Sequence, residues 1–586
     1  MILKSQVKIK NKSKHLSRLK TKSATSLMAG AVLAIMSTAL HSHESLVYLD
    51  QGWNEAQRNA YYTTPQGSNL VSKRFYFALE QAGKRRLFSD PKNIRKYNYI
   101  FDESTNDSDD DDDDDDDRGE LLPIGFAVEP QASGEDWIGY TCSACHTNEI
   151  RYDDYRIRLD GAPSLSDFNG FVTALSNAAK DTLDNNRKFQ RFSERLDNSD
   201  YSAESDLRLE LQAFSDSMSA FVARNDLADN SHYGRVDAFG IIMNELFVDD
   251  LGFPGNHNPA NALVSYPALW DTPSHDYVQW NGSASNPIGR NVGEVLGTFG
   301  SVDLQNPSTL GNTSARAEEL IAIERLLTTL KSPAWPQEIL GEIDSEKAMA
   351  GRVIYTEYRG DEPSCSSCHA LQDSTGTYPL TPAEENAFGV QFVNTDMIPL
   401  GEIGTDPRMA LNFVTRTAST AQLAPFLPAP FTGAAELPAP VFLSILARFA
   451  VGTSLAAIDP PLTTPEFFEA IGFRVAAPGF PDYTPENLFA YRARPLDGIW
   501  ASAPYLHNGS VQNLYELLLP AEERKESFNV GSQRFDPKRV GFRNSHGRNT
   551  STLDTFDIGD SNSGHEYGTT LGKKERWALI EFMKTL

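Results

Sequence analysis

The apolar and polar positions along the chain predict helices joined by long loops. In four segments apolar residues recur at every third or fourth position, a spacing typical of amphipathic helices. These segments are LSDFNGFVTALSNAAKDTLDN, SDLRLELQAFSDSMSAFVAR, ARAEELIAIERLLTTLK and the closing KKERWALIEFMKTL. Stretches rich in Pro, Gly and Asn, at 251–290, 424–440 and 459–483, predict loops between the helices. We therefore expect a mainly α protein with much loop.

The N-terminus carries the pattern of a secretory signal peptide. Residues 1–24 hold eight lysines and arginines and no acid, and the apolar stretch LMAGAVLAIMSTAL follows. Its STA tripeptide fits the small-x-small pattern of a cleavage site. An uncleaved anchor is the alternative, but this stretch is short for a span of about 20 residues. We predict that residues 1–42 are removed and that the mature protein is periplasmic or secreted, with no later stretch apolar enough to cross a bilayer.

Net charge narrows the possible partners. The 586-residue chain carries a formal net charge of −26. So acidic a surface argues against nucleic acid and against an anionic membrane, and it suits a basic partner protein. The most acidic part, residues 102–120, includes consecutive aspartates from Asp109 to Asp117. Because like charges repel one another, we expect a solvated loop there, with a calcium site as the alternative.

All four cysteines fall in two C-x-x-C-H pentapeptides. Two thiols three residues apart reach the two vinyl groups of one haem, and the following histidine ligates its iron. Local disulfides are the alternative in an exported chain, whereas zinc needs four ligands and each pentapeptide offers three. Because two copies use every cysteine, we expect two covalently bound haems c. The residues that hold them are Cys142, Cys145 and His146 for the first haem, and Cys365, Cys368 and His369 for the second.

The spacing of the two pentapeptides predicts two haem domains. Their histidines are 223 residues apart (369 − 146), which is more than one small c-type domain needs. After the signal peptide, we therefore divide the chain into three parts. These are an N-terminal extension with the acidic loop (43–120), a first haem domain (121–345) and a second haem domain (346–586).

The second axial position of each iron decides what the haem does. A strong sixth ligand makes an electron relay, whereas an open position binds dioxygen or peroxide. Among the remaining histidines His507 stands out, because Asn508-Gly509 predicts a tight turn directly after it. Met397 and Met409 are the competing candidates. The other histidines outside the pentapeptides and the signal region are His232, His257, His275, His546 and His565.

Four further stretches carry recognisable patterns, of which those with QWNG and APYLHNGSV are much more specific than the haem motifs. They are QGWNEAQRNAYYTTPQGS, WIGYTCSACHTNEIRYDDYRIRLDGAPSLSDF, SYPALWDTPSHDYVQWNGSASNPIGRN and APYLHNGSVQNLYELLLP. They resemble the di-haem cytochrome c peroxidase superfamily, most closely its di-haem oxygenase branch of rubber oxygenases and fatty-acid di-haem dioxygenases. The resemblance covers most of residues 46–586. It implies an active-site first haem, an electron-transfer second haem with His507 as its distal ligand, and a bound calcium ion whose ligands the sequence does not identify.

Two positions depart from the peroxidase pattern. Peroxidases of the superfamily commonly carry PYMHDG, with a methionine available to the electron-transfer haem, and Leu506 stands at that position here. They also carry a glutamate eight residues after a tryptophan that matches Trp280. Counted without a gap, Ile288 takes the place of that acid–base group, although Glu294 lies nearby. Trp280 and Trp270 are the aromatic candidates for the pocket or for an electron path, unless they only pack in the core.

Three functions stay open on these grounds. The first, favoured by the resemblance, is an oxygenase that adds dioxygen to an unsaturated hydrophobic substrate, a fatty acid or an isoprenoid, at the first haem. The second is a peroxidase that reduces hydrogen peroxide with electrons from a small periplasmic donor protein and uses Glu294. The third is an electron-transfer cytochrome without catalysis, in which protein ligands saturate both irons.

Overall fold

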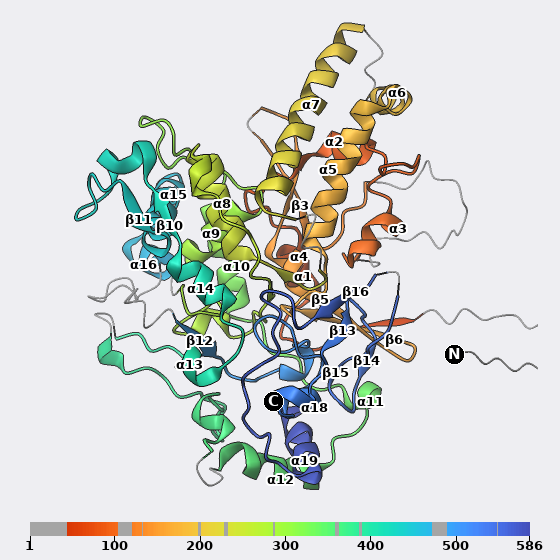
Figure 1. The fold of residues 1–586 in the computed structure, drawn as a ribbon, viewed down its shortest axis with the longest axis vertical. Coiled ribbons are helices and arrows are strands. Elements are labelled where there is room, and N and C mark those ends of the chain that lie inside the picture. Colours follow the sequence, from red (N-terminus) through yellow and green to blue (C-terminus); the bar gives the residue numbers. More distant parts are fainter. Residues whose placement is uncertain are drawn as a thin grey trace, which may run out of the picture. The chain divides into compact units, whose positions relative to one another are not determined.

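The computed structural model describes residues 44–102, 120–131, 133–196, 201–227, 232–284, 287–357, 362–385, 389–471, 489–547 and 549–586. These residues belong to one compact unit, Glu44–Leu586 (Figure 1). Helices account for 41% and strands for 14%, so the class is mixed, and the expectation of a mainly α protein is confirmed only in part. The predicted signal peptide, 1–42, and the aspartate run, 109–117, lie outside the described residues.

Two three-stranded sheets flank the first pentapeptide. Their strands are β1 (Ser45–Tyr48), β2 (Val71–Ser72), β3 (Phe126–Glu129), β4 (Trp137–Tyr140), β5 (Thr147–Tyr152) and β6 (Tyr155–Asp160). One sheet has the order β2-β4-β3 and is antiparallel, and the other has the order β1-β6-β5 with a parallel β1–β6 pair. The short helix α4 (Cys142–Cys145) joins β4 to β5. The first two cysteines therefore lie on a connection that is fixed at both ends.

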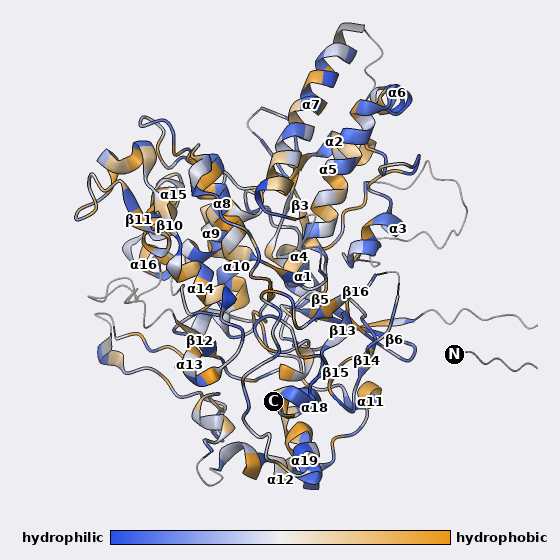
Figure 2. Ribbon diagram, viewed as in Figure 1, coloured by the Kyte–Doolittle hydropathy of each residue, from blue (hydrophilic) through white to orange (hydrophobic). Residues whose placement is uncertain are grey.

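Three helices form a separate layer over the first of these sheets. They are α5 (Phe168–Asp184), α6 (Asn186–Arg195) and α7 (Tyr201–Arg224). The ribbon of α7 alternates between polar and apolar turns in Figure 2, as the sequence pattern predicts, and the buried residues of α5 and α7 share one core. Asp167 caps α5 by accepting a hydrogen bond from the Gly170 backbone at 2.9 Å. The predicted helices in these two segments are confirmed.

A second helical layer mixes residues from both predicted haem domains. It contains α8 (Ala238–Asn244) with its π-helical continuation η3 (Glu245–Asp250), α9 (Pro287–Gly297), α10 (Ala317–Leu327), α14 (Arg408–Thr415), α15 (Ala439–Ala456) and α16 (Thr464–Ile471). Residues of these helices share one hydrophobic core, which therefore crosses the predicted boundary at 345/346. Helix α16 lies inside the stretch 459–483 that the sequence predicts to be a loop, so that prediction is wrong over these residues.

Helix α15 has a composition that needs an explanation. By length and composition it is the one helix in the described part of the chain that is apolar enough to cross a membrane. This corrects the prediction that no stretch after the N-terminus is so apolar. Half of the helix is buried inside the protein, as in a core helix, and one of its faces lines a groove described below.

Two helices close the C-terminal part around the second pentapeptide. Helix α12 (Ser345–Thr356) packs against α19 (Lys573–Met583), which confirms the predicted closing helix. Their backbones approach so closely that a Cβ added at Gly351 would meet the Ala578 carbonyl oxygen at 2.0 Å. The strand β9 (Asp396–Pro399) pairs antiparallel with β12 (Ala490–Ala493) between this part and the helical layer. Residues of this strand pair line the two cavities described below.

The remaining elements are short. The helices are α1 (Glu55–Thr63), α2 (Lys73–Ala78), α3 (Pro91–Ile94), α11 (Gln337–Leu340), α13 (Leu400–Ile403) and α18 (Leu514–Leu517). The strands are β7 (Arg235–Val236), β8 (Val264–Ser265), β10 (Thr417–Ser419), β11 (Glu436–Pro438), β13 (Ser527–Val530), β14 (Phe535–Asp536), β15 (Gly541–Phe542) and β16 (Ser551–Asp554). They pair as β7–β8, β10–β11, β13–β16 and β14–β15.

Candidate haem-binding sites

The first pentapeptide lines a largely apolar cavity. Cys142, Cys145 and His146 lie on one wall, and neither thiol is in a disulfide. The His146 Nδ1 lies 2.8 Å from the carbonyl oxygen of Pro267, and the Tyr61 hydroxyl donates to the His146 carbonyl at 2.9 Å. With Nδ1 engaged, Nε2 is the nitrogen left for an iron ion.

Burial sets the protonation of these three groups. It raises the pKa of the Cys142 and Cys145 thiols to about 12 and lowers the pKa of His146 to about 4, against the bond to Pro267, which raises it. The histidine is therefore a neutral imidazole near pH 7, the form that ligates iron. Two thiols and a neutral imidazole on the wall of an apolar cavity fit a covalently attached haem.

The same cavity also holds a carboxylate. Among the described residues that line the cavity, His146 is the sole histidine and there is no methionine. Glu294 lines it too and accepts a hydrogen bond from the Gln279 side chain at 2.9 Å. Burial raises the pKa of Glu294, while Arg290 opposes that shift. Ile288, the residue that an ungapped count puts at the acid–base position, is buried in the helical core and is not among the described residues that line this cavity.

The second pentapeptide repeats the local construction of the first. Cys365 begins the 3-10 helix η6 (Cys365–Ser367), and Cys365, Cys368 and His369 line a second apolar cavity. The His369 Nδ1 lies 2.7 Å from the Arg494 carbonyl oxygen, and the Tyr355 hydroxyl donates to the His369 carbonyl at 3.2 Å. A tyrosine from a preceding helix and a distant backbone carbonyl thus orient each histidine in the same way. This pairing has no signature in the sequence.

Two further histidines line the second cavity. The His565 ring centroid lies 6.2 Å from that of His369, with 46° between the ring planes. An imidazole nitrogen lies about 2.0–2.1 Å from a transition metal, so the centroids of two rings on opposite sides of one ion are roughly 6 Å apart. The ring of His507 lies on Tyr491 instead, with 4.0 Å between centroids and 26° between planes. The sequence predicts His507 as the second axial ligand, whereas the spacing favours His565.

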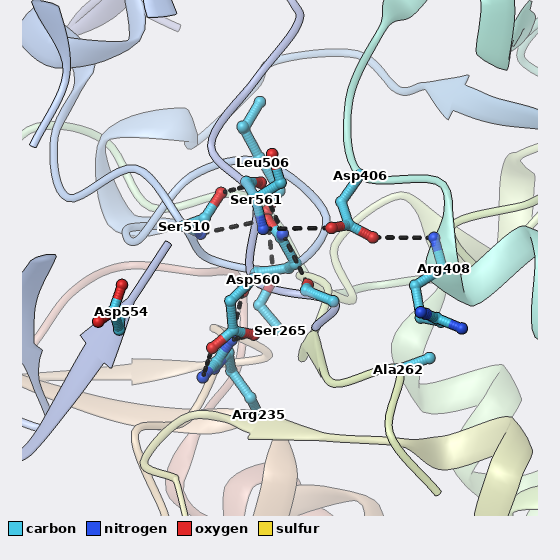
Figure 3. A network of polar contacts seen from close by, with 12 residues as sticks. Arg235, Ala262, Ser265, Asp406, Arg408, Leu506, Ser510, Asp554, Asp560 and Ser561 are labelled. Carbon is cyan, nitrogen blue, oxygen red and sulfur yellow. Dashed lines mark hydrogen bonds and ion pairs between the residues drawn. The ribbon is translucent and has the colours of Figure 1, made fainter. Parts of the chain in front are cut away.

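The loops that carry these two histidines are held together by a buried polar network (Figure 3). Arg235 and Asp560 form an ion pair at 2.6 Å with almost no exposed side-chain surface. The Asn508 side chain donates to the carbonyl oxygens of Gly559 and Ser561, each at 3.0 Å. The segment after His507 and the segment before His565 are therefore fixed to each other through several contacts.

The two cavities share one wall. The residues that line both are Ser265, Tyr266, Pro267, Trp280 and Arg492. The Trp280 indole donates to the Ser265 carbonyl at 2.8 Å, and the Arg492 backbone donates to the Trp280 carbonyl at 2.8 Å. Trp270 is not among the described residues that line either cavity. It is fully buried in the main core, and its indole donates to the Asp497 carbonyl at 2.8 Å.

Arg492 is the second feature that fits a haem. Burial, followed by the neighbouring charge of Arg494, lowers the pKa of Arg492 to about 9. Its Nη1 donates to the Tyr277 carbonyl at 2.6 Å, but its buried Nε has no hydrogen-bond partner among the described residues. A buried cation with an unused donor beside two cavities suits the propionate carboxylates of a haem. Arg290, the other arginine on the first cavity, is already paired with Glu324 at 2.6 Å.

The other predicted ligands lie elsewhere. The described residues that line the second cavity do not include Met397 or Met409. The Met397 side chain packs beside Gly282, and Met409 is buried in a small core with Tyr491. In the described part of the chain, no group of three or more His, Cys, Asp or Glu side chains gathers as a metal site, so no calcium ligands are found there.

Comparison with known proteins supports a haem protein. Residues 490–529 match a family model described as RoxA-like, cytochrome c-like. That segment is similar to a cytochrome c domain of the RoxA type. It contains Arg492, Arg494 and His507, so the match falls on the shared wall and on the second cavity.

Two relatives come from Sinorhizobium fredii. The uncharacterized protein y4iJ is 29% identical over 604 residues, which cover 93% of this chain and 94% of y4iJ. The uncharacterized protein y4iM is 24% identical over 355 residues, which cover 56% of this chain and 65% of y4iM. The family match supports a likeness to the di-haem oxygenase group at a coarse level and implies covalently bound haem c. It indicates a haem c oxidoreductase.

Proposed function

We propose that this protein is an exported di-haem oxygenase that adds dioxygen to an unsaturated, hydrophobic substrate at its first haem. Cys142, Cys145 and His146 would hold that haem, and Cys365, Cys368 and His369 would hold a second haem, with His565 as the favoured further ligand. The observation that carries the proposal is the first cavity. Its described lining is largely apolar and offers no second histidine or methionine to close the iron.

A bound haem with a free axial position supplies the activation of dioxygen. The chain supplies the surroundings. Phe239, Ile242 and Val295 give the first cavity an apolar lining that excludes water and accepts a hydrophobic substrate. The carbonyl of Pro267 keeps the His146 ring in one orientation, which fixes the face from which the iron is held.

The shared wall gives the second haem its role. Trp280 lies on both cavities and is held from both ends by backbone hydrogen bonds, so its ring is a fixed aromatic bridge between the two sites. His369 and His565 would both be available to the iron of a second haem, and a haem held in that way would store or relay electrons. A small periplasmic protein is the partner that would exchange electrons with it, and the acidic surface suits a basic one.

A peroxidase is the second candidate, because Glu294 lies in the first cavity. A buried carboxylate with a raised pKa, held by Gln279, is suited to accept and return a proton during cleavage of peroxide. The same carboxylate is compatible with an oxygenase, in which its bond to Gln279 would only shape the cavity. The two candidates therefore differ in what the loss of this one carboxylate does.

The test uses the purified holoprotein and the substitution Glu294→Gln. Oxygen uptake is measured with oleate or a short polyisoprenoid under air, and peroxide turnover is measured with a reduced small cytochrome. We expect oxygen uptake by the native protein and a change of only a few-fold in the variant. Peroxide turnover that falls about 10²-fold or more in the variant, without oxygen uptake by either protein, would establish the peroxidase instead. No response to any of these substrates would leave an electron-transfer cytochrome.

A further inference from the structure

An apolar groove lies beside the first haem cavity. It has a volume of about 650 Å³, within the range of sites for small organic ligands. Helices α9, α15 and α16 and the residues before α16 line it. Its apolar lining includes Leu443, Ala447, Val451, Leu455, Leu462 and Phe467.

Helix α15 presents a continuous stripe to this groove. Its lining positions recur at intervals of three and four residues from Pro440 to Ala456, which is one face of an α-helix. The opposite face, with Phe442, Leu446 and Ala450, is buried in the helical core. A helix that is apolar on both faces needs a nonpolar neighbour on each of them. The helical core is the nonpolar neighbour of one face, and a ligand in the groove would be the nonpolar neighbour of the other.

The groove and the first haem cavity meet at a short boundary. Five residues line both spaces: Phe239, Ile242, Gln279, Arg290 and Glu294. The charged and polar ones among them are engaged with each other or with neighbours, since Gln279 bonds to Glu294 and Arg290 pairs with Glu324. Phe239 and Ile242 are the two apolar side chains that this boundary offers to a hydrophobic ligand.

We propose that this groove binds the substrate as a single aliphatic chain that runs along α15 and reaches the first haem past Phe239 and Ile242. The reaction of this ligand at the first haem rests on the proposed function, whereas its binding is argued from the groove alone. Burial of methylene groups against α15 drives the binding, because it removes apolar surface from water. A fatty acyl chain and an isoprenoid chain share this chemistry.

Two glycines allow the groove to be filled without disturbing the protein. Gly293 on α9 and Gly452 on α15 both line it, and a Cβ added at either would meet no atom of the described residues within 4 Å. Replacing each with leucine therefore adds bulk only to the groove and raises helix propensity. Gly401 on α13 has the same open surroundings but does not line the groove in the described structure, so Gly401→Leu is the matched control.

The experiment measures binding of a fluorescent polyene fatty acid to the haem-loaded protein without oxygen. Emission is quenched when the probe binds near a haem. We expect saturable quenching by the native protein and by Gly401→Leu, and an affinity that falls about ten-fold or more in Gly293→Leu and Gly452→Leu. Haem content and visible spectra are recorded for all four proteins, so that a folding defect is recognised.

Competition then separates the possible ligands. Displacement of the probe by oleate but not squalene identifies an acid, and displacement by both identifies the chain alone as the ligand. Equal affinities in all four proteins would overturn the proposal, as would association with phospholipid vesicles by a protein that does not bind the monomeric probe. Groove-dependent binding without oxygen uptake would retain the binding site and refute the oxygenase, so the two proposals fail separately.

Discussion

The two haem cavities hold their proximal histidines in the same way but differ in what faces them. In each cavity a tyrosine hydroxyl bonds the backbone of the histidine, and a distant carbonyl lies on its Nδ1. The first cavity otherwise holds apolar side chains and Glu294, whereas the second cavity also holds His507 and His565. Under the proposed function, the shared construction would attach a haem, and the other residues of each cavity would decide whether its iron reacts or transfers electrons.

The secondary-structure elements that build the two cavities differ as well. Helices α8 and α9 build the wall of the first cavity, and it continues into an apolar groove. Loops build the corresponding wall of the second cavity, and a buried ion pair and side-chain amide bonds fix those loops. A helical wall can vary in side chains without losing its shape, whereas a loop wall depends on its polar contacts.

The largest expected effect comes from removing the thiols of one cavity at a time. Cys142→Ala with Cys145→Ala should remove one haem and abolish oxygen uptake, because the second cavity has no free iron position. Cys365→Ala with Cys368→Ala should also remove one haem while the first remains attached. Intact mass and haem content per chain measure both results. If either double variant retained two haems per chain, the assignment of one pentapeptide to each cavity would be refuted.

A smaller effect, confined to one iron, distinguishes the two histidines of the second cavity. We expect His565→Ala to convert the second haem from low spin to high spin, because it removes the ring 6.2 Å from that of His369. His507→Ala should leave the spin state unchanged, because that ring packs on Tyr491. Electron paramagnetic resonance of the oxidised proteins measures this. The reverse pattern would return the ligand to His507, as the sequence predicts.

These ligands show what can be predicted from the sequence and what cannot. The pentapeptides, and the helices that became α5, α7, α10 and α19, follow from local spacing. His565 does not, because its approach to His369 depends on a loop that passes Gly404 so closely that a Cβ added at Gly564 would meet its carbonyl carbon at 2.1 Å. Such a close backbone contact between distant segments leaves no periodic pattern in the chain.

The place of Glu294 in the first cavity could not be predicted from the sequence for a similar reason. Ile288 lies in the first turn of α9 and faces the core, while Glu294, in the second turn, faces the cavity. An ungapped count from Trp280 cannot identify this, because the helix begins at Pro287 and sets a new phase for the residues that follow. The stretch 251–290, which the sequence predicts to be a loop, lines the first cavity with strand β8 and the residues after it, Val264, Ser265, Tyr266 and Pro267.

Because polar contacts fix the loops of the second cavity, we expect a loss of stability when those contacts are removed. Asp560→Asn leaves the Arg235 charge buried without its partner, which should lower the free energy of unfolding by about 3–5 kcal/mol. The double variant Arg235→Met with Asp560→Leu should lose much less, because no unpaired charge stays buried. Denaturant unfolding of the holoprotein measures both. A double variant as unstable as Asp560→Asn would show that the contacts of these loops matter more than their charge balance.

The smallest expected effect tests the wall that the cavities share. Trp280→Phe keeps an aromatic ring between them but loses the indole bond to Ser265, which should cost about 1 kcal/mol of stability. We expect electron transfer from the second haem to the first to slow, because the smaller ring no longer reaches both cavities. Trp270→Phe is the matched control, since it loses an equivalent bond to Asp497 in the core and should leave that rate unchanged. Rapid reduction followed by absorbance at the two haems measures the rate. If both variants slowed electron transfer equally, the two cavities would be coupled through the whole core, and Trp280 would not be a specific path between them.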